Sequence, residues 1–370
     1  MTFVWGILAL GLLVFVHELG HFAAARFFGV TVEAFSIGMG PVLIHRKRKE
    51  TDYRLSLIPL GGYCAMKGEQ DFRTAIEQEL TEIKADADSF YGIHPLKRLA
   101  IALAGPLANL AFGFLAFFIV ALTGYSYYSA GTTVSMADEL YPDISSAAKS
   151  AGMKTGDEIL SLNGVKMEDF SEIASYISAR PQERIEAEVR RGNDILMISV
   201  VPELDKETGA GRIGIAADPN SVVKRSYPRH SIPGAFREGA VQSWRIIFLT
   251  AKGAAALFKG VNLANAVSGP VRITSMIGTA AQQGFSAGMR EGIAATLQFL
   301  ALISISLFLT NLLPVPVLDG GLILFALIEF LARRKLNPKL LYRIQIAGVF
   351  IIAALIAVSL AGDILYFLRK

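Results

Sequence analysis

Four stretches of the chain are free of charged residues and rich in apolar ones, namely residues 1–16, 99–137, 292–318 and 344–362. A membrane-spanning helix needs about 20 predominantly apolar residues. The pattern therefore predicts four spans, the second ending near Gly124. The first stretch stays apolar through Phe22–Phe28 and has neither a basic start nor a small-residue cleavage site. We interpret it as a retained span and not as a signal peptide.

Between Ala130 and Pro219 the composition becomes that of an ordinary globular domain. Residues 147–164 predict a short helix, a glycine turn, a strand and an Asn-Gly turn. A helix is predicted over Asp169–Ala179, and two strands joined as a hairpin are predicted over 184–190 and 195–201. The segment thus predicts a small α+β domain inserted between membrane spans.

The run from Ala147 to Gly164 resembles the PDZ domain in its bacterial, circularly permuted form. This resemblance implies that the last strand, Gly211–Ile215, lies beside a groove that accepts a peptide strand. The groove residues would then be Ile213, Gly214 and Ile215. Two interpretations stay open, a peptide-binding module and a spacer that keeps large proteins away from the membrane.

Three further segments have recognisable patterns. Residues 235–258 are amphipathic, which predicts a helix on the membrane surface. Tyr53, Leu55 and Leu57 alternate with polar residues, as in a strand. The acidic run between Glu69 and Asp88 predicts an exposed helix.

Composition narrows the function classes. Hydrophobic residues make up 52% of the 370 positions and charged residues only 18%, which excludes a disordered or fully soluble chain. The formal net charge of +4 is dispersed, so no nucleic-acid partner is expected. The single cysteine, Cys64, excludes an internal disulfide framework and a cysteine-rich metal module. Basic clusters at residues 45–49 and 333–335 predict that these two loops are cytoplasmic.

The first span ends in the sequence His17-Glu18-Leu19-Gly20-His21. Two histidines four residues apart share one face of a helix and can ligate the same metal ion. Glu18, beside them, can take a proton from a metal-bound water. Ionisable side chains are costly inside a membrane segment, so this cluster indicates chemistry more than a polar helix end.

Two histidines leave a zinc site one protein ligand short. The third candidate is Asp319, which follows Pro314 and Pro316 near the end of the third span. Proline cannot continue a helix, so the span must break there. Irregular backbone at membrane depth is tolerated only where it is buried in protein or lines a cavity. The alternative is an aspartate that simply faces the cytoplasm past the helix end.

Taken together, HELGH in the first span, the PDZ-like module and the run from Asn311 to Gly321 resemble the site-2 protease family of intramembrane zinc metalloproteases. The resemblance covers essentially the whole chain. It implies Zn²⁺ as cofactor, with His17, His21 and Asp319 as its ligands and Glu18 as the catalytic residue. The family commonly carries two PDZ modules, whereas this chain has room for one.

The resemblance also implies how a substrate is held. The family asparagine that steadies the substrate backbone falls on Asn311, and a second family-like segment, Ala104–Asn109, contributes Asn109. The region of Tyr53–Met66 corresponds to a membrane-dipping β-hairpin. Its strand with Tyr53, Leu55 and Leu57 could accept an unwound substrate by strand addition.

The resulting expectation is a membrane α-helical bundle of about four spans, with a membrane-associated β-hairpin and an inserted α+β PDZ domain. The expected function is cleavage of transmembrane segments in regulated intramembrane proteolysis, for example of anti-sigma factors or signal-peptide remnants. The expected partners are membrane proteins with an unwindable helix, a peptide ligand of the PDZ groove, and the lipid bilayer. The alternatives are a non-catalytic PDZ adaptor in the membrane and a transporter.

The expected location is the bacterial cytoplasmic membrane, with the PDZ domain outside and the active site toward the cytoplasm. The expected domain bounds are 1–28 (span 1), 29–93 (hairpin loop and acidic helix), 94–126 (span 2), 127–221 (PDZ), 222–291 (membrane-associated helices), 292–330 (span 3) and 331–370 (basic loop and span 4).

Overall fold

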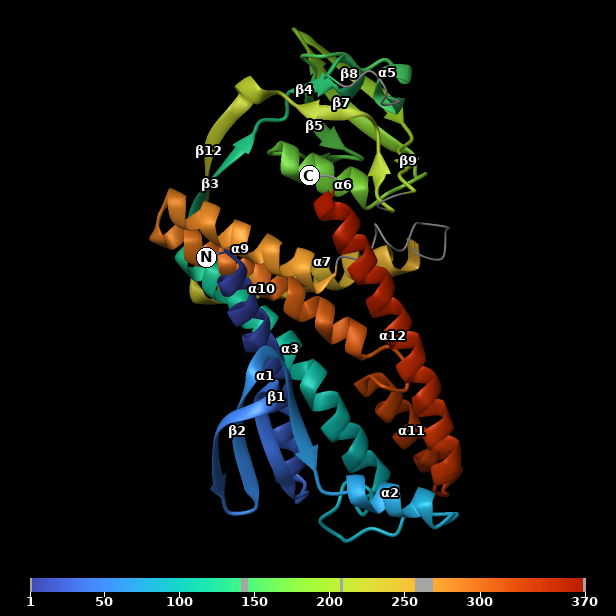
Figure 1. The fold of residues 1–370 in the computed structure, drawn as a ribbon. Coiled ribbons are helices and arrows are strands. Elements are labelled where there is room, and N and C mark those ends of the chain that lie inside the picture. The colour runs from blue at the N-terminus through green and yellow to red at the C-terminus, as the bar shows by residue number, and fades with distance from the viewer. Residues whose placement is uncertain (1, 141–145, 207–208, 257–268, 369–370) are drawn as a thin grey trace. The chain divides into compact units, whose positions relative to one another are not determined.

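The computed structural model describes residues 2–140, 146–206, 209–256 and 269–368, and it is drawn in Figure 1. The chain divides into two compact units. The helical unit comprises Met1–Thr123, His230–Ile247 and Gly269–Lys370, and the inserted unit comprises Gly124–Arg229 and Phe248–Ser268. Membrane helices, a β-hairpin and a PDZ-like domain are all present, so the predicted fold class is confirmed.

Four helices are long and apolar enough to cross a membrane, and they carry the four predicted stretches. They are α1 (Thr2–Phe27), α3 (Pro95–Thr123), α10 (Met289–Asn311) and α12 (Pro338–Leu368). The chain is therefore a multi-pass membrane protein.

The core of the helical unit is formed where α1, α3 and α10 meet α9 (Pro270–Ala287). Leu13 of α1 is fully buried there, next to Ile277 and Leu300. A Cβ atom at Gly20 of α1 would overlap the backbone of Ala104 in α3, so glycine is what lets these two helices approach closely. This close crossing brings the HELGH segment against α3.

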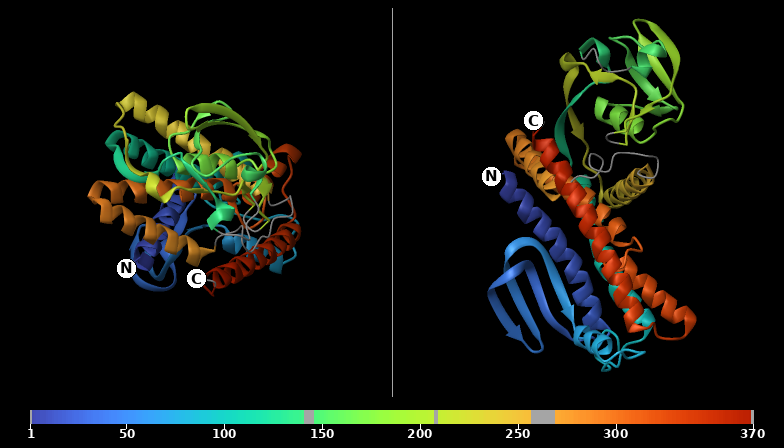
Figure 2. Two further views of the ribbon diagram at one scale, coloured as in Figure 1. Left: turned by 90° about the horizontal axis from the view of Figure 1, so that it is seen from above. Right: turned by 45° about the vertical axis from the view of Figure 1, so that its right-hand side comes forward.

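The predicted hairpin is larger than the segment Tyr53–Met66. It consists of β1 (Val32–Arg48) and β2 (Thr51–Met66), and β2 packs along α1 (Figure 2). Both strands bend back, so that Phe35 is paired with Tyr53 on one side and with Cys64 on the other. The sheet therefore has inner segments whose backbone is paired on both sides, and outer segments paired on one side only.

The third span breaks where the prolines predicted it. Helix α10 ends at Asn311, and a new helix, α11 (Asp319–Ala332), begins at the predicted aspartate. Arg98 of α3 and Glu329 of α11 form a buried ion pair, and Glu329 also accepts a hydrogen bond from the Leu336 N–H. This pair ties α11 to α3 near the end of α11 opposite Asp319.

The acidic run forms less helix than predicted. Helix α2 covers Glu69–Glu77, and the residues that follow, up to Asp88, are not helical. Lys67 instead holds two of their carboxylates, at 2.8 Å from Asp86 and 2.7 Å from Asp88. A compact turn held by ion pairs replaces the second half of the predicted helix.

The inserted unit contains the predicted PDZ elements. Its four-stranded antiparallel sheet has the order β6-β5-β7-β8, built from β5 (Glu158–Leu162), β6 (Val165–Lys166), β7 (Ile185–Arg191) and β8 (Asp194–Val200). The helices are α4 (Ala137–Leu140), α5 (Ala147–Ser150) and α6 (Phe170–Ser178), the last capped by the Asp169 carboxylate. Buried Ile159, Leu162 and Ile173 fill the core beneath them.

Short two-stranded ribbons complete this unit. They pair β3 (Tyr125–Ala130) with β12 (Val222–Tyr227), β4 (Val134–Met136) with β11 (Ile215–Ala217), and β9 (Glu203–Leu204) with β10 (Gly211–Arg212). The predicted last strand is interrupted at Ile213 and Gly214, because Gly214 has a φ of +77°. A 3-10 turn covers Pro219–Ser221.

The predicted amphipathic surface helix is α7 (Ile232–Ala256). Its residues up to Ile247 belong to the helical unit, and those from Phe248 belong to the inserted unit. Trp244 is 68% exposed and Phe236 60%, so this helix presents large apolar side chains outward. Residues 257 and 258 of the prediction lie outside the described residues.

Candidate metal centre

His17, His21 and Asp319 converge, although they come from opposite ends of the chain. Their ligand atoms all lie within 4.8 Å of one another. His17 Nε2 lies 3.1 Å from Asp319 Oδ2, His21 Nε2 lies 3.2 Å from Asp319 Oδ1, and the two Nε2 atoms are 3.2 Å apart. Ligands placed tetrahedrally about 2.0–2.1 Å from a zinc ion are separated by roughly 3.3 Å. The spacing of these three side chains therefore fits one zinc ion.

The ring of His21 is oriented by a backbone carbonyl. His21 Nδ1 lies 2.8 Å from the carbonyl oxygen of Ile101, which can only accept a hydrogen bond. Nδ1 must then carry the proton, so Nε2 keeps its lone pair for the metal. Sequence reasoning missed Ile101, because a backbone acceptor leaves no signal in the side-chain pattern.

The ring of His17 is approached by two asparagines. Nδ2 of Asn109 lies 3.1 Å and Nδ2 of Asn311 3.5 Å from His17 Nδ1. Asn109 is fully buried, and its Oδ1 has no hydrogen-bond partner. A side-chain amide can face the ring with either atom, and only its oxygen can accept the Nδ1 proton of a metal-bound histidine. An Asn109 turned in this way would satisfy both groups.

A buried oxygen of Asp319 also points to a cation. Asp319 Oδ2 lies 3.1 Å from His17 Nε2, an atom that keeps its lone pair when Nδ1 carries the proton, and no other described group donates a hydrogen bond to it. A buried carboxylate oxygen without a donor is costly, and a bound metal ion removes that cost. The donor set, two imidazoles and one carboxylate, is one that zinc uses in catalytic sites, where a fourth position stays open for water.

Glu18 lines the same cavity as the three ligands. The cavity has a volume of about 350 Å³, and Asn311, Tyr63 and Cys64 also line it. Cys64 and Glu18 thus face the same space, which places the outer edge of β2 beside Glu18. The arrangement combines a metal-binding triad, a carboxylate base and a polar amide around one space, which is suited to hydrolysis by metal-activated water.

The structure does not bring Tyr53, Leu55 and Leu57 to this cavity. Tyr53 packs against Phe22 of α1 and Phe35 of β1, and Leu55 and Leu57 are 44% and 55% exposed. The β2 residues that line the cavity are Tyr63, Cys64 and Met66. Gly62, which precedes Tyr63, lies beside α1, since a Cβ atom at this position would be 3.4 Å from Val14 Cγ1 and 3.5 Å from Glu18 Cγ.

The predicted PDZ groove is a separate, smaller cavity. Its volume is about 160 Å³, and Ile213, Gly214 and Ile215 line it together with Phe170 and Ile177 of α6. The carbonyl oxygens of Ile213 and Gly214 are both engaged, accepting from the N–H groups of Ala148 and Ala137. The three predicted groove residues therefore lie together on one wall.

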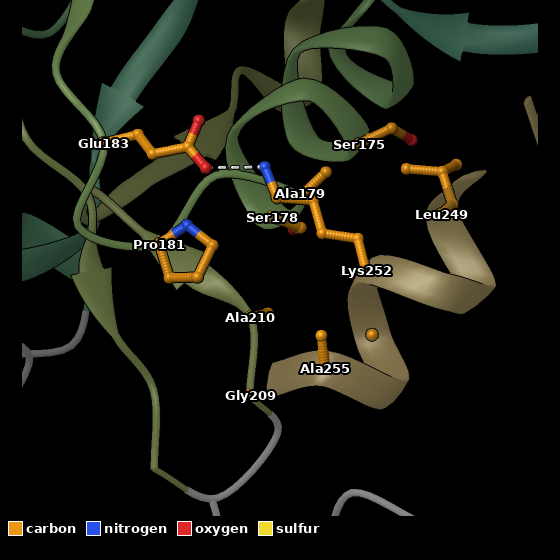
Figure 3. Close-up of a pocket in the computed structure, with 11 residues that line it drawn as sticks. Ser175, Ser178, Ala179, Pro181, Glu183, Gly209, Ala210, Leu249, Lys252 and Ala255 are labelled. Atoms are coloured by element: carbon orange, nitrogen blue, oxygen red, sulfur yellow. Dashed lines mark hydrogen bonds and ion pairs between the residues drawn. The ribbon is translucent and has the colours of Figure 1, made fainter. Parts of the chain in front are cut away.

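Another cavity, of about 380 Å³, lies in the inserted unit between the end of α6 and the last turns of α7 (Figure 3). Lys252 crosses it to reach Glu183 at 2.7 Å. The Glu183 carboxylate, the only acidic group that lines this space among the described residues, is thus already paired. The lining offers no metal-ligating set comparable to that of His17, His21 and Asp319.

The spans and the triad together define a membrane metalloprotease. A sequence model of peptidase family M50 matches residues 5–355, and the chain belongs to that family. It is a zinc metalloprotease with a PDZ-like domain. This family membership replaces the adaptor and transporter alternatives.

Several relatives resemble the chain over nearly its whole length. A protein of Treponema pallidum named "Putative zinc metalloprotease" is 33% identical, with 97% of this chain and 98% of the relative covered. A Campylobacter jejuni relative is also 33% identical, covering 98% and 93%, and one from Clostridium perfringens is 31% identical, covering 99% of both chains. A crystal structure of the HtrA3 PDZ domain with a phage-derived ligand is 25% identical, covers 22% of this chain and 89% of its own, and has a TM-score of 0.15.

Proposed function

We propose that this protease cleaves peptide bonds within membrane-spanning segments of other proteins. The observation that carries the proposal is the position of His17 and Glu18, well inside the candidate span Trp5–Phe27. At 1.5 Å per residue, His17 lies roughly 18 Å along the helix from Trp5. A bond that reaches Glu18 must itself lie within the thickness of the bilayer. The substrates are therefore membrane proteins, with anti-sigma factors and signal-peptide remnants as the proposed kinds.

The roles of the residues follow from the geometry. His17, His21 and Asp319 would hold zinc, which when bound polarises the scissile carbonyl and lowers the pKa of water. Glu18, in the same cavity, receives the proton of the attacking water and passes it to the leaving amine. Asn311 lines this cavity and can hold a backbone group of the substrate with its side-chain amide.

The substrate backbone would be held at the outer edge of the hairpin. Residues 62–66 have β partners on one side only, within β1. Tyr53 has partners on both sides, Arg46 and Phe35, so its backbone is already used. Strand addition needs an unpaired edge. We therefore assign the substrate-binding edge to residues 62–66, beside Glu18, in place of the strand with Tyr53, Leu55 and Leu57.

Replacing Glu18 by glutamine tests the catalytic role. The purified protein would be reconstituted in lipid vesicles with a fluorescently tagged single-span substrate. Because the general base is lost, cleavage by Glu18→Gln should fall about 10²–10⁴-fold, while the zinc content stays at the wild-type level. Glu77→Gln, an exposed residue of α2, is the matched control and should cleave normally. Normal cleavage by Glu18→Gln would overturn the mechanism.

A second experiment tests whether the substrate must unwind. A helix shields its peptide bonds by its own hydrogen bonds, so a substrate span with Gly and Asn near the cut should be cleaved faster than a poly-Leu span of equal length. Equal rates for the two spans in the same vesicles would contradict strand addition at residues 62–66, while leaving the role of Glu18 intact.

We further propose that the PDZ-like groove binds an extended peptide, in preference to acting as a spacer. The apolar lining by Phe170, Ile177 and Ile213 suits a peptide with a large apolar side chain. Binding would be measured by fluorescence anisotropy on the full-length protein, using a labelled peptide with a C-terminal valine. Ala174→Trp, which fills the groove, should abolish binding, and equal binding by this variant would contradict the proposal.

The proposed location is the bacterial cytoplasmic membrane, with the PDZ-like domain outside and residues 45–49 and 333–335 inside. The basic clusters support this orientation. In a variant whose Cys64 is replaced by alanine, a cysteine placed at Lys47 should be shielded from an impermeant maleimide in intact cells. A cysteine placed at Asn193 should be labelled, and the reverse pattern would contradict this orientation.

A further inference from the structure

A basic cavity lies in the helical unit between the start of α3 and the end of α11. Its volume is about 780 Å³. The charged side chains that line it are Arg98, Glu329, Arg333, Arg334 and Lys335. None of its lining residues lines the metal cavity, the PDZ-like groove or the cavity beside α7. Neither the metal centre nor the peptide groove accounts for it.

The charges around this cavity are not balanced. Arg98 and Glu329 are paired with each other, so they cancel. Arg333, Arg334 and Lys335 are all exposed, and no described carboxylate forms an ion pair with any of them. Three neighbouring cations at one cavity create a field that attracts a multiply charged anion or a phosphate group.

Besides the unbalanced charge, the side chain of Arg98 in the wall of this cavity also points to a missing ligand. The Arg98 side chain is only 9% exposed, and its Nε has no hydrogen-bond partner among the described residues. Buried guanidinium N–H groups are normally satisfied. Arg98 lines the cavity at the first turn of α3, which is also the electropositive end of that helix.

Apolar groups and the position in the bilayer specify the kind of anion. Leu331, 70% exposed, and Phe330, 39% exposed, line the same cavity. The cavity lies where the candidate span Pro95–Thr123 begins, and the end of a span is the level of the lipid head groups. A ligand with a phosphate next to a hydrocarbon chain matches both kinds of lining.

We propose that this cavity binds one anionic phospholipid, such as phosphatidylglycerol. Its phosphodiester would lie among Arg98, Arg333, Arg334 and Lys335, and an acyl chain would lie against Phe330 and Leu331. Cations at the C-terminal end of α11 also complement the helix dipole, but this role explains the charge alone and not the cavity or the buried Arg98.

Native mass spectrometry of the full-length protein, released from vesicles of equal phosphatidylglycerol and phosphatidylcholine, tests the proposal. The test variant is Arg333→Gln/Arg334→Gln/Lys335→Gln. The matched control is Arg46→Gln/Lys47→Gln/Arg48→Gln, which removes the same charges from the exposed hairpin turn. Because three basic residues near the lipid surface are removed, the test variant should retain phosphatidylglycerol at least about tenfold less than the wild type, and the control should match the wild type.

Equal loss of the lipid in both variants would overturn the proposal, because it would show general attraction to the membrane surface. Equal retention of phosphatidylcholine by the wild type would also overturn it. An excess of inorganic phosphate over the lipid distinguishes the two sources of phosphate. If it displaces the lipid, free phosphate is the ligand and the lipid assignment fails. Unchanged zinc content in both variants shows that the fold is intact, independently of catalysis.

Discussion

Gly105 of α3 lies directly against the imidazole of His21, so that a Cβ atom at position 105 would overlap the metal-facing Nε2. The same turn of α3 holds the other side of the ring through the Ile101 carbonyl. Two features of α3 therefore position the His21 ring. The missing side chain of Gly105 leaves room for the ring, and the Ile101 carbonyl oxygen accepts its Nδ1 proton.

Gly105→Ala should weaken zinc binding, because the added methyl group would displace the His21 ring from the position in which Nε2 faces the metal site. Changes around metal ligands typically cost about 10–100-fold in metal affinity. Zinc retained after dialysis against graded chelator would be measured by mass spectrometry. Gly253→Ala in α7, where a Cβ would meet nothing within 4 Å, is the control. Equal zinc retention by the two variants would show that Gly105 does not position His21.

Asn109 should act on His17 as a hydrogen-bond acceptor. Asn109→Leu removes the acceptor and is expected to lower zinc affinity about 10–100-fold. Asn109→Asp keeps an oxygen next to His17 Nδ1 and should retain much more zinc than the leucine variant. The same chelator series compares the two. A leucine variant that binds zinc as well as the aspartate variant would show that Asn109 merely fills space.

The PDZ-like domain should become less stable in acid through Asp157. Burial raises the pKa of this carboxyl, but the hydrogen bonds from Arg191 and from the Lys154 N–H outweigh it, so its pKa lies below the ordinary 3.8. A depressed pKa contributes stability that is fully present above the unfolded value, about 3.9, and is lost as the pH falls through the folded value. The protection factors of the amides in β5 and β7, which compare their exchange with that of an unfolded chain at the same pH, should therefore fall below about pH 4.

Arg191→Gln should reduce this acid-dependent loss, because the pKa of Asp157 rises toward its unfolded value once the main group that lowers it is gone. The domain should also lose on the order of 1–3 kcal/mol at neutral pH, since a buried carboxylate loses its partner. Arg190→Gln breaks the exposed pair with Glu158 at 2.7 Å and should cost less than about 1 kcal/mol. If the two arginine variants behaved alike in the exchange measurement, the role assigned to Asp157 would be wrong.

Asp363 of α12 should hold the start of α9. Its carboxylate accepts hydrogen bonds from the N–H groups of Gly269, Val271 and Arg272, at 2.9, 3.0 and 3.2 Å. Asp363→Asn leaves one acceptor oxygen, so we expect a loss of about 1–2 kcal/mol in the local stability of α9. Hydrogen exchange over Pro270–Ala287 measures it. Asp194→Asn, at the exposed first residue of β8 in the inserted unit, should leave α9 unchanged, and an equal effect would contradict the capping role.

The spans and the convergence of the triad were predictable because each has a strong local signal. Charge-free stretches report membrane helices whatever they pack against. His17, Glu18 and His21 share a helix face, and two prolines require a break before Asp319.

Contacts between distant segments could not be predicted. The pairing of Phe35 with both Tyr53 and Cys64 depends on where the hairpin bends, and glycines and a proline in β1 hide any alternation. The Arg98–Glu329 pair joins residues of two helices far apart in the sequence, and the Ile101 acceptor is a backbone atom. Single-sequence patterns carry no information about such partners.

The division of the triad between the first helix and the segment after the proline break also governs when this enzyme can become active. A chain emerging from the ribosome carries both histidines and the glutamate first, and the aspartate only 298 residues after His21. Until α11 is inserted beside α1, no complete set of ligands exists. A copy that stops before Asp319 therefore lacks one ligand and cannot form the metal centre.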